Sequence, residues 1–257
     1  MCPGAVAVSS VRSLWSFRWS AQRLGDRGSA DRAASSVAVM PNDARMFFAQ
    51  FLQHPWRVGA VAPSSAALAA QAVAPLPGTG EPVVVELGPG TGAFTAAIQE
   101  RLGGRGYHLA VELDAAFAAA LRRRHPRVDV VVADAVRLPQ LLALRGLPGA
   151  DVVVSGLPWL AFAPTRSVGI LSAVASTMTP QAALTTFAYV HTRWASPARR
   201  LRAELARTFE ELVLGRTVWA NLPPALVYHA RRPRRSVLAG VGPDRLEVVV
   251  DETEPVG

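Results

Sequence analysis

The chain lacks lysine, has a single cysteine and contains no long uncharged apolar run. Because Cys2 stands alone, an intrachain disulfide and a cysteine-based zinc cluster are both excluded. No run of about 18 apolar residues is free of charge, so no membrane-spanning helix is expected. The five histidines show no ligand spacing, so no metal site is expected either.

All 27 basic residues are arginine, and they outnumber the 19 acidic residues to give a net charge of +8. Arginine in place of lysine, beside abundant alanine, glycine and proline, indicates biased codon usage rather than a need for bidentate hydrogen bonds. The positive balance itself favours an anionic partner, either nucleic acid or an anionic membrane surface. With 257 residues, half of them hydrophobic, the chain can bury the sheet of one α/β domain.

Composition divides the chain into four segments. Residues 1–39 are rich in arginine, serine and alanine, and we expect either a disordered leader or an extension upstream of the true start. Residues 40–80 are predicted to form N-terminal helices that contact a membrane. Residues 81–231 carry the main domain, and 232–257 are expected to form a partly disordered tail.

In the main domain, short Val- and Leu-rich runs alternate with helix-like stretches, which is typical of a parallel sheet covered on both faces. The strands are expected at Pro82–Leu87, His108–Leu113, Val128–Ala133, Ala150–Val154, Ala183–Val190, Val213–Ala220 and Ala225–Ala230. The helices are expected at Ser64–Val73, Ala93–Leu102, Ala115–Arg124, Arg137–Leu144, Arg166–Met178 and Pro197–Glu211. The last two strands are close enough to pair antiparallel. The predicted fold is therefore α/β, a Rossmann-like, doubly wound, mixed seven-stranded sheet with one reversed edge strand.

A glycine-rich turn follows the first strand and is the strongest motif in the chain. Glu86 ends the strand, and Gly88, Gly90 and Gly92 form a Gly-x-Gly-x-Gly turn before a helix. Glycines let a ligand approach the main chain closely. A dinucleotide site would have the wider Gly-x-Gly-x-x-Gly spacing that seats a pyrophosphate. The tighter turn suits a ligand without pyrophosphate, and Glu86 suits the ammonium of a methionine moiety.

Acids also end the second and third strands. Glu112 lies 24 positions after Gly88, close to where a ribose-binding acid belongs, and can accept both ribose hydroxyls. Asp134 would accept from an adenine amino group. Each acid has an alternative role at the start of the next helix, although Asp114 fits that role better than Glu112.

This arrangement resembles class I S-adenosylmethionine (SAM)-dependent methyltransferases over Val83–Tyr228. The resemblance implies that SAM is the cofactor, and that it is bound by the Gly88–Gly92 turn, Glu112 and Asp134. These motifs are specific for the cofactor but not for the acceptor.

The fourth strand runs into Ser155, Gly156, Leu157, Pro158 and Trp159, at the edge where open α/β sheets bind ligands. The segment resembles the Asn/Asp-Leu/Pro-Pro-Tyr/Phe loop of amino-methyltransferases. In enzymes that dimethylate rRNA adenine, the asparagine accepts from the amine and the aromatic ring stacks on the base. Gly156 has no such acceptor, so adenine fits less well. The Ser-Gly-Leu-Pro-aromatic form resembles bacterial phospholipid N-methyltransferases, which methylate phosphatidylethanolamine.

Two other regions resemble the same lipid family: Phe47–Phe51 followed by Val58–Ser65, and Tyr189–Pro197. In that family Tyr189 and Arg193 would hold the acceptor's phosphate, and Tyr189 would join the acceptor loop in the catalytic site. The alternatives are a strand-end aromatic and a solvated arginine. Trp159 is bulkier than the aliphatic residue expected there, which leaves the headgroup open.

The resemblance implies a cytoplasmic, peripherally membrane-associated N-methyltransferase whose partners are a phospholipid headgroup and an anionic membrane surface. The aromatic stripe of Arg45–Gln53 is predicted to enter the membrane, with packing in the core as the alternative. One alternative function is an rRNA adenine N6-methyltransferase, but the 27 residues after Ala230 are too few for the helical domain such enzymes add. Another is a non-catalytic SAM-binding scaffold. No prediction of oligomeric state follows.

Overall fold

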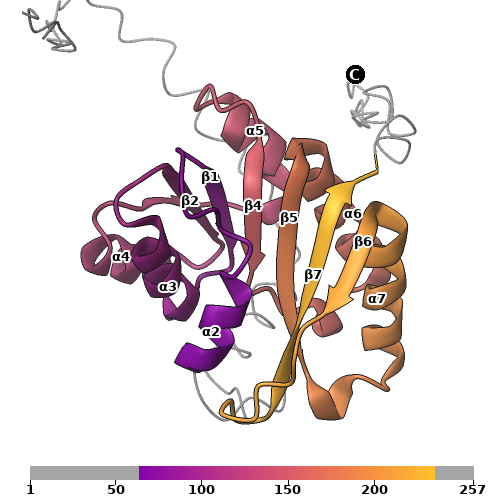
Figure 1. The fold of residues 1–257 in the computed structure, drawn as a ribbon. Coiled ribbons are helices and arrows are strands. Elements are labelled where there is room, and N and C mark those ends of the chain that lie inside the picture. Colours follow the sequence, from indigo (N-terminus) through magenta and orange to yellow (C-terminus); the bar gives the residue numbers. More distant parts are fainter. Residues whose placement is uncertain (1–63, 235–257) are drawn as a thin grey trace, which may run out of the picture. The chain divides into compact units, whose positions relative to one another are not determined.

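The computed structural model describes residues 64–234, which form a seven-stranded sheet in the order β3-β2-β1-β4-β5-β7-β6 (Figure 1). The predicted segments 1–39 and Arg45–Gln53 and most of the 232–257 tail lie outside the described residues. The strands are β1 (Val83–Leu87), β2 (Tyr107–Glu112), β3 (Asp129–Val132), β4 (Ala150–Ser155), β5 (Met178–Tyr189), β6 (Phe209–Leu214) and β7 (Ala225–Pro233).

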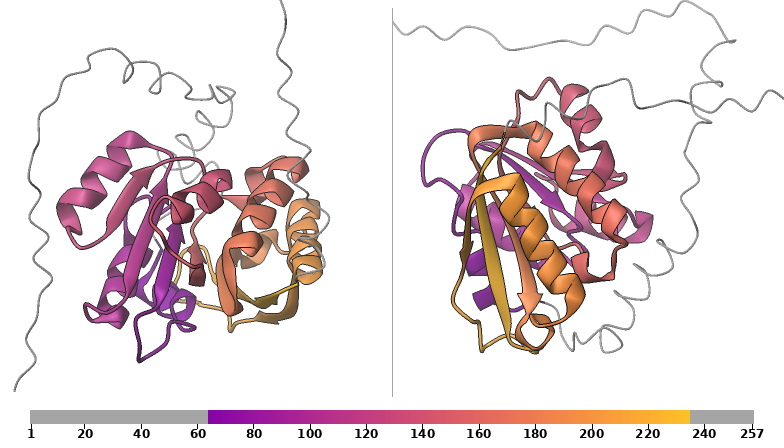
Figure 2. Two further views of the ribbon diagram at one scale, coloured as in Figure 1. Left: turned by 90° about the horizontal axis from the view of Figure 1, so that it is seen from above. Right: turned by 90° about the vertical axis from the view of Figure 1, so that its right-hand side faces the viewer.

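Helices lie on both sides of this sheet (Figure 2). They are α2 (Ala66–Ala72), α3 (Ala93–Leu102), α4 (Ala115–Arg124), α5 (Leu138–Ala143), α6 (Pro164–Thr177) and α7 (Ser196–Thr208). The side chains of α5, α6 and α7 share one hydrophobic core with β1, β4 and β5, while α2 and α3 pack on the opposite face. Among residues 64–234 we find no helix whose length and apolar character would let it cross a bilayer.

The predicted Rossmann-like mixed sheet is confirmed, but the place of its reversed strand is not. β7 runs antiparallel to both β5 and β6, whereas β1 to β5 pair in parallel. The reversed strand therefore lies inside the sheet, and the prediction of a reversed edge strand was wrong. Burial explains the order, because Val227 and Tyr228 of β7 are buried on opposite faces while Val213 and Leu214 of β6 are exposed. A strand that is apolar on both faces needs a cover on both.

The last helix and strand also have different bounds from those predicted. The helix predicted over Pro197–Glu211 ends at Thr208, and β6 occupies Phe209–Leu214 instead of Val213–Ala220. Helical periodicity continues through Phe209, but its side chain is 1% exposed in the core. The two glutamates of β6 form ion pairs with Arg232 of β7 at 3.0 and 2.7 Å. Pairing across the sheet thus overrides the local helical pattern.

Side chains cap two of the helices, and the capping role predicted for Asp114 is confirmed. The Ser65 hydroxyl accepts the Leu68 N–H at the start of α2, and the Asp114 carboxylate accepts the N–H groups of Ala116 and Phe117 in α4. Helix α2 belongs to the main core, because the Thr185 hydroxyl of β5 donates to the Ala72 carbonyl at 2.9 Å. The boundary predicted at residue 80 therefore does not separate α2 from the sheet.

Candidate cofactor and acceptor site

The glycine-rich turn has a backbone that other residues adopt only with strain. Gly88, Gly90 and Gly92 have φ values of 65°, 52° and 88°. A Cβ at Gly88 would lie 2.9 Å from a methyl of Leu157, and one at Gly92 would lie 2.9 Å from a methyl of Leu121. The backbone conformation therefore favours glycine at all three positions, whereas a Cβ at Gly88 or Gly92 would displace only the end of a flexible leucine side chain.

Glu112 at the end of β2 is fully buried and holds this turn. Its carboxylate accepts the N–H groups of Gly90 and Asp114, both at 3.0 Å. Burial raises the pKa of Glu112, and the hydrogen bonds from the backbone lower it by less. A carboxylate has about four acceptor positions, so two hydrogen bonds leave Glu112 with acceptor capacity. The ribose-binding role of Glu112 stays a prediction.

Glu86 is also fully buried, beneath the start of α3. One oxygen accepts the Thr95 hydroxyl at 2.7 Å and lies 3.2 Å from Nε2 of His108. The other oxygen, Oε1, has no hydrogen-bond partner among the described residues. A buried acceptor without a partner is costly, so it calls for a donor from a ligand or water. The ammonium of a methionine moiety is a donor that would suit this acceptor.

Asp134 has the capping role that was the alternative to adenine binding. Its carboxylate accepts the Val136 N–H at 3.2 Å in a 3₁₀ turn and forms an ion pair with Arg166 at 3.1 Å. The Arg166 guanidinium also lies 5.3 Å from the ring centre of Phe162. Sequence reasoning missed Arg166, which is 32 positions away and follows no motif. The adenine role stays a prediction, and Arg166 would have to share Asp134 with the base.

A small pocket of about 20 Å³ lies between the turn and these residues. Its lining includes Gly88, Leu113, Asp134, Leu157, Phe162 and Arg166. The predicted cofactor residues from β1 and β3 thus meet at one place, at the carboxyl ends of the strands.

The acceptor loop begins at Gly156, which lies directly against the cofactor turn. Its N–H donates to the Leu87 carbonyl at 2.8 Å. A Cβ at this position would be 2.7 Å from the Gly88 carbonyl oxygen, closer than real Cβ contacts come. Packing therefore accounts for glycine at the position where the adenine enzymes have asparagine.

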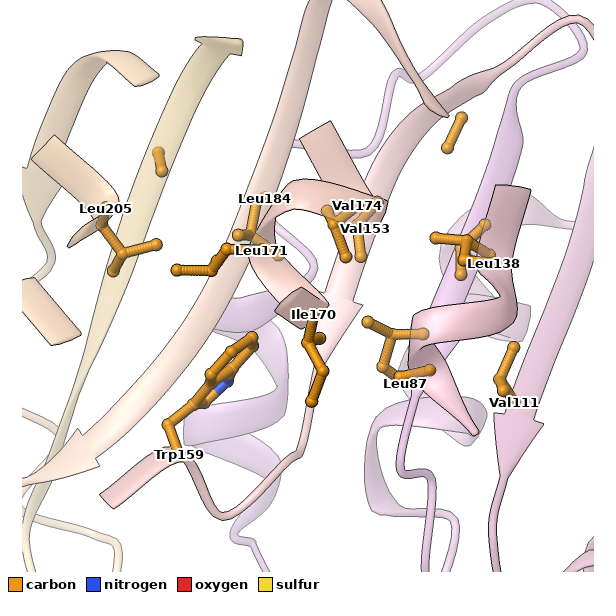
Figure 3. Packing of buried hydrophobic residues seen from close by; sticks show 14 of the residues in the cluster. Leu87, Val111, Leu138, Val153, Trp159, Ile170, Leu171, Val174, Leu184 and Leu205 are labelled. Atoms are coloured by element: carbon orange, nitrogen blue, oxygen red, sulfur yellow. The ribbon is translucent and has the colours of Figure 1, made fainter. Parts of the chain in front are cut away.

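Trp159 is an anchor of this loop. Its side chain is 3% exposed, and its indole N–H donates to the buried Ser155 hydroxyl at 3.0 Å. Figure 3 shows the ring beside Ile170 and Leu171 of α6. The indole of Trp159, which is bulkier than the aliphatic residue of the family pattern, fills the core under α6. The hydrogen bond to Ser155 satisfies the indole N–H.

A second pocket, of about 60 Å³, lies between the acceptor loop and the end of β5. It is lined by Leu157, Pro158, Trp159, Leu160, Ala161, Phe187, Ala188, Tyr189 and Thr192. Phe187 packs edge-on against Phe94 of α3 and against Tyr189, at 5.8 and 5.6 Å between ring centres. Sequence reasoning missed this role of Phe187, although its place two residues before Tyr189 puts both on one face of β5.

Tyr189 and Arg193 lie at the end of β5 as predicted. Burial raises the pKa of Tyr189 to about 12, so its hydroxyl is a neutral donor at physiological pH. Its ring stacks on His191 at 5.9 Å. Arg193 is exposed, and its guanidinium lies 4.2 Å from the ring centre of Trp194. The phosphate-binding role of this pair stays a prediction.

Comparisons with known proteins agree with this geometry. The family described as "Ribosomal RNA adenine dimethylase" matches residues 65–140. The chain is 33% identical over 197 residues to the ornithine lipid N-methyltransferase of Singulisphaera acidiphila, covering 74% of this chain and 97% of that protein. It is 37% identical over 89 residues to ribosomal RNA small subunit methyltransferase A of a Burkholderia species, covering 34% of this chain and 31% of that protein.

Among solved structures, an O-methyltransferase from Bacillus cereus in complex with SAH superposes with a TM-score of 0.52 at 11% identity, covering 78% of this chain and 96% of that one. This likeness supports the fold. The match to the rRNA family ends at residue 140, before the acceptor loop, so it concerns the cofactor half. The match to the lipid enzyme spans nearly that whole protein. The chain is therefore a SAM-dependent N-methyltransferase of class I, and it belongs to the same family as the ornithine lipid N-methyltransferase.

Proposed function

We propose that the acceptor is the amine of a membrane-lipid headgroup. The observation that carries this is the 33% identity to an ornithine lipid N-methyltransferase over 97% of its length, which includes the acceptor half of the fold. Gly156 supports it, because the residue has no side chain to accept from an adenine amine. Phosphatidylethanolamine, expected from the sequence, and ornithine lipid, named for the relative, both present a headgroup amine.

The residues of the chain have three tasks in this reaction. The Gly88–Gly92 turn, Glu86 and Glu112 would hold SAM, which supplies a methyl group on a sulfonium. The Leu157–Trp159 loop and Tyr189 would surround the acceptor and exclude water from the amine. A carbon–nitrogen bond would form as the carbon–sulfur bond of the sulfonium breaks with a thioether as leaving group, and the headgroup ammonium would release its proton to bulk water before the site excludes water. Alignment of this kind can supply much of the acceleration.

Tyr189 would act as a donor in this site. Because burial raises its pKa to about 12, the hydroxyl keeps its proton and cannot serve as the base at neutral pH. Together with Arg193 it would bind the anionic group of the headgroup, since a cation and a phenol are both good donors to an anion. No strong base is needed, because the headgroup amine loses its proton before attack.

The proposal is tested by incubating the full chain with labelled SAM, vesicles that contain phosphatidylethanolamine or ornithine lipid, and ribosomal RNA. We expect the label in one of the aminolipids after separation of the fractions. Gly90→Val is the control, because a side chain at φ 52° in the buried turn should block SAM and abolish all labelling. Label confined to RNA would replace the lipid proposal with the adenine alternative.

A further inference from the structure

Two loops at the carboxyl edge of the sheet expose large apolar side chains. Trp194, in the β5–α7 connection, is 69% exposed. Trp219 and Leu222, in the β6–β7 connection, are 75% and 60% exposed. We call these three residues the tryptophan edge. Single exposed apolar residues are ordinary, but a group of them at one place indicates an interaction surface.

The two loops are tied to each other. The N–H of Val190, at the end of β5, donates to the Pro224 carbonyl at 2.8 Å. Val218 and Ala225 form an isolated β-bridge that closes the β6–β7 connection. Both loops emerge at the same end of the sheet, and α7 begins beside the β5–α7 connection (Figure 1). The residues of the tryptophan edge therefore lie on two hydrogen-bonded loops at one end of the sheet.

The β6–β7 loop buries the polar Asn221 and exposes two apolar side chains close to it, Trp219 and Leu222. Asn221 is 3% exposed; its Oδ1 accepts the Ser65 N–H at 2.9 Å, and its Nδ2 donates to the Pro223 carbonyl at 2.7 Å. Its neighbours Trp219 and Leu222 point away from the protein. A loop adapted to water alone would have the opposite arrangement. The hydrogen bonds of Asn221 fix the loop in this form.

The surroundings of the tryptophan edge are strongly basic. Segments 190–202 and 212–224 contain five arginines and no acidic residue. Arg193, Arg199, Arg200 and Arg216 are exposed. Tryptophan prefers the boundary between membrane and water, and arginine is attracted by anionic headgroups. An anionic bilayer matches both features, whereas a purely apolar protein surface matches only one.

We propose that the tryptophan edge docks the enzyme on an anionic lipid bilayer. This inference rests on the proposed function, because the acceptor pocket is lined by Tyr189, at the end of β5, and by Thr192, in the same connection as Trp194. A headgroup can then reach the pocket while its acyl chains stay in the bilayer. The tryptophan edge is distinct from the Arg45–Gln53 segment, which the sequence predicts to enter the membrane. Its contribution to membrane binding can therefore be measured by substitutions that leave that segment intact.

The experiment compares the full chain with a Trp219→Ser, Leu222→Ser double variant, which leaves the Arg193–Trp194 contact intact, and a Leu144→Ser control. Leu144 is 81% exposed after α5, at the amino edge of the sheet. Binding is measured by sedimentation with vesicles of phosphatidylglycerol and phosphatidylcholine in equal parts. The double variant should lose about tenfold or more in partition coefficient, which is about 1.4 kcal/mol. The control should bind as the wild type, and all three should melt alike because the changed side chains are exposed.

Two results would overturn the docking surface. One is a double variant that sediments with vesicles as the wild type does. The other is a wild type that is dimeric in vesicle-free solution and a double variant that is monomeric, because the edge would then join two copies of the chain.

Activity separates this inference from the proposed function. On a short-chain aminolipid that is monomeric in solution, the double variant should match the wild type, while on vesicles it should be slower. If the wild type binds vesicles through the edge but methylates no aminolipid in either form, the proposed acceptor fails and the docking surface stands. If the wild type methylates lipid and the double variant works equally well on vesicles, the docking surface fails and the acceptor stands.

Discussion

Replacing Gly156 by alanine tests the contact between the acceptor loop and the cofactor turn. The new methyl group would lie 2.7 Å from the Gly88 carbonyl oxygen. It cannot move away freely, because the Gly156 N–H is bonded to the Leu87 carbonyl at 2.8 Å. Overpacking of this kind costs about 1–3 kcal/mol. We therefore expect Gly156→Ala to lower the free energy of unfolding by that amount.

Gly169 in α6 provides a matched control with the opposite sign. A Cβ at Gly169 meets no atom within 4 Å. Glycine inside a helix is less stable than alanine by roughly 0.5–1 kcal/mol, so Gly169→Ala should stabilise the fold. In a domain of this size, each 1 kcal/mol moves the melting temperature by about 2–4 °C. The two substitutions add the same methyl group, so the difference in melting temperature reports the crowding at Gly156 together with the helix propensity gained at Gly169.

Circular dichroism gives the melting temperatures, and calorimetry gives the affinity for SAM. Gly156→Ala should melt lower and bind SAM more weakly, because the displaced oxygen belongs to the turn. Gly156→Asn should behave likewise and should not acquire activity on adenine. A Gly156→Ala protein that melts at or above the wild-type temperature and binds SAM normally would refute the packing explanation for the missing asparagine.

Further predictions concern three acids, of which Glu112 ends β2, Asp114 follows β2 and Asp134 follows β3. Glu112→Ala should weaken SAM binding by about 1.5–3 kcal/mol in calorimetry. Asp114→Ala should cost about 1 kcal/mol of stability as a lost cap and less than tenfold in affinity. Burial raises the pKa of Glu112 above the usual 4.5. Its contribution to the free energy of unfolding is therefore greatest below pH 4.5 and is lost as pH rises through the raised pKa. In urea titrations, Glu112→Gln should remove this dependence of the free energy of unfolding on pH. If Asp134 accepts from adenine despite Arg166, wild type should prefer SAH to its inosine analogue by roughly tenfold to a hundredfold, and Asp134→Asn should lose that preference.

The cofactor half could be predicted because its determinants are adjacent in the chain. The turn conformation is required by glycines within five consecutive positions, Gly88–Gly92, and β1 before them is uniformly apolar apart from Glu86. The caps at Ser65 and Asp114 act on N–H groups two or three residues away. Helices α3 and α4 consequently have the predicted bounds.

The remainder depends on contacts between distant residues. The Arg166–Asp134 pair spans 32 positions, and the Asn221–Ser65 hydrogen bond spans 156. Neither has a local pattern that could reveal it. The position of β7 depends likewise on which strand can be covered on both faces, and the spacing of the last two strands is compatible with either order. Exposure of the tryptophan edge also becomes visible only once the two loops are placed together.

The contact between Gly88 and Gly156 relates the two halves of the site to each other. A residue without a side chain lets the acceptor loop close on the cofactor turn, and the same absence removes the group that would recognise an adenine amine. Recognition of the acceptor must then come from the other wall of the pocket, where Phe187 and Tyr189 lie on β5. That wall continues into the connection that carries Arg193 and Trp194. If the acceptor is a lipid amine, the residues that select it and residues that contact the membrane belong to one continuous segment of the chain. A change of acceptor within this family should therefore require changes in this segment rather than in the glycine-rich turn.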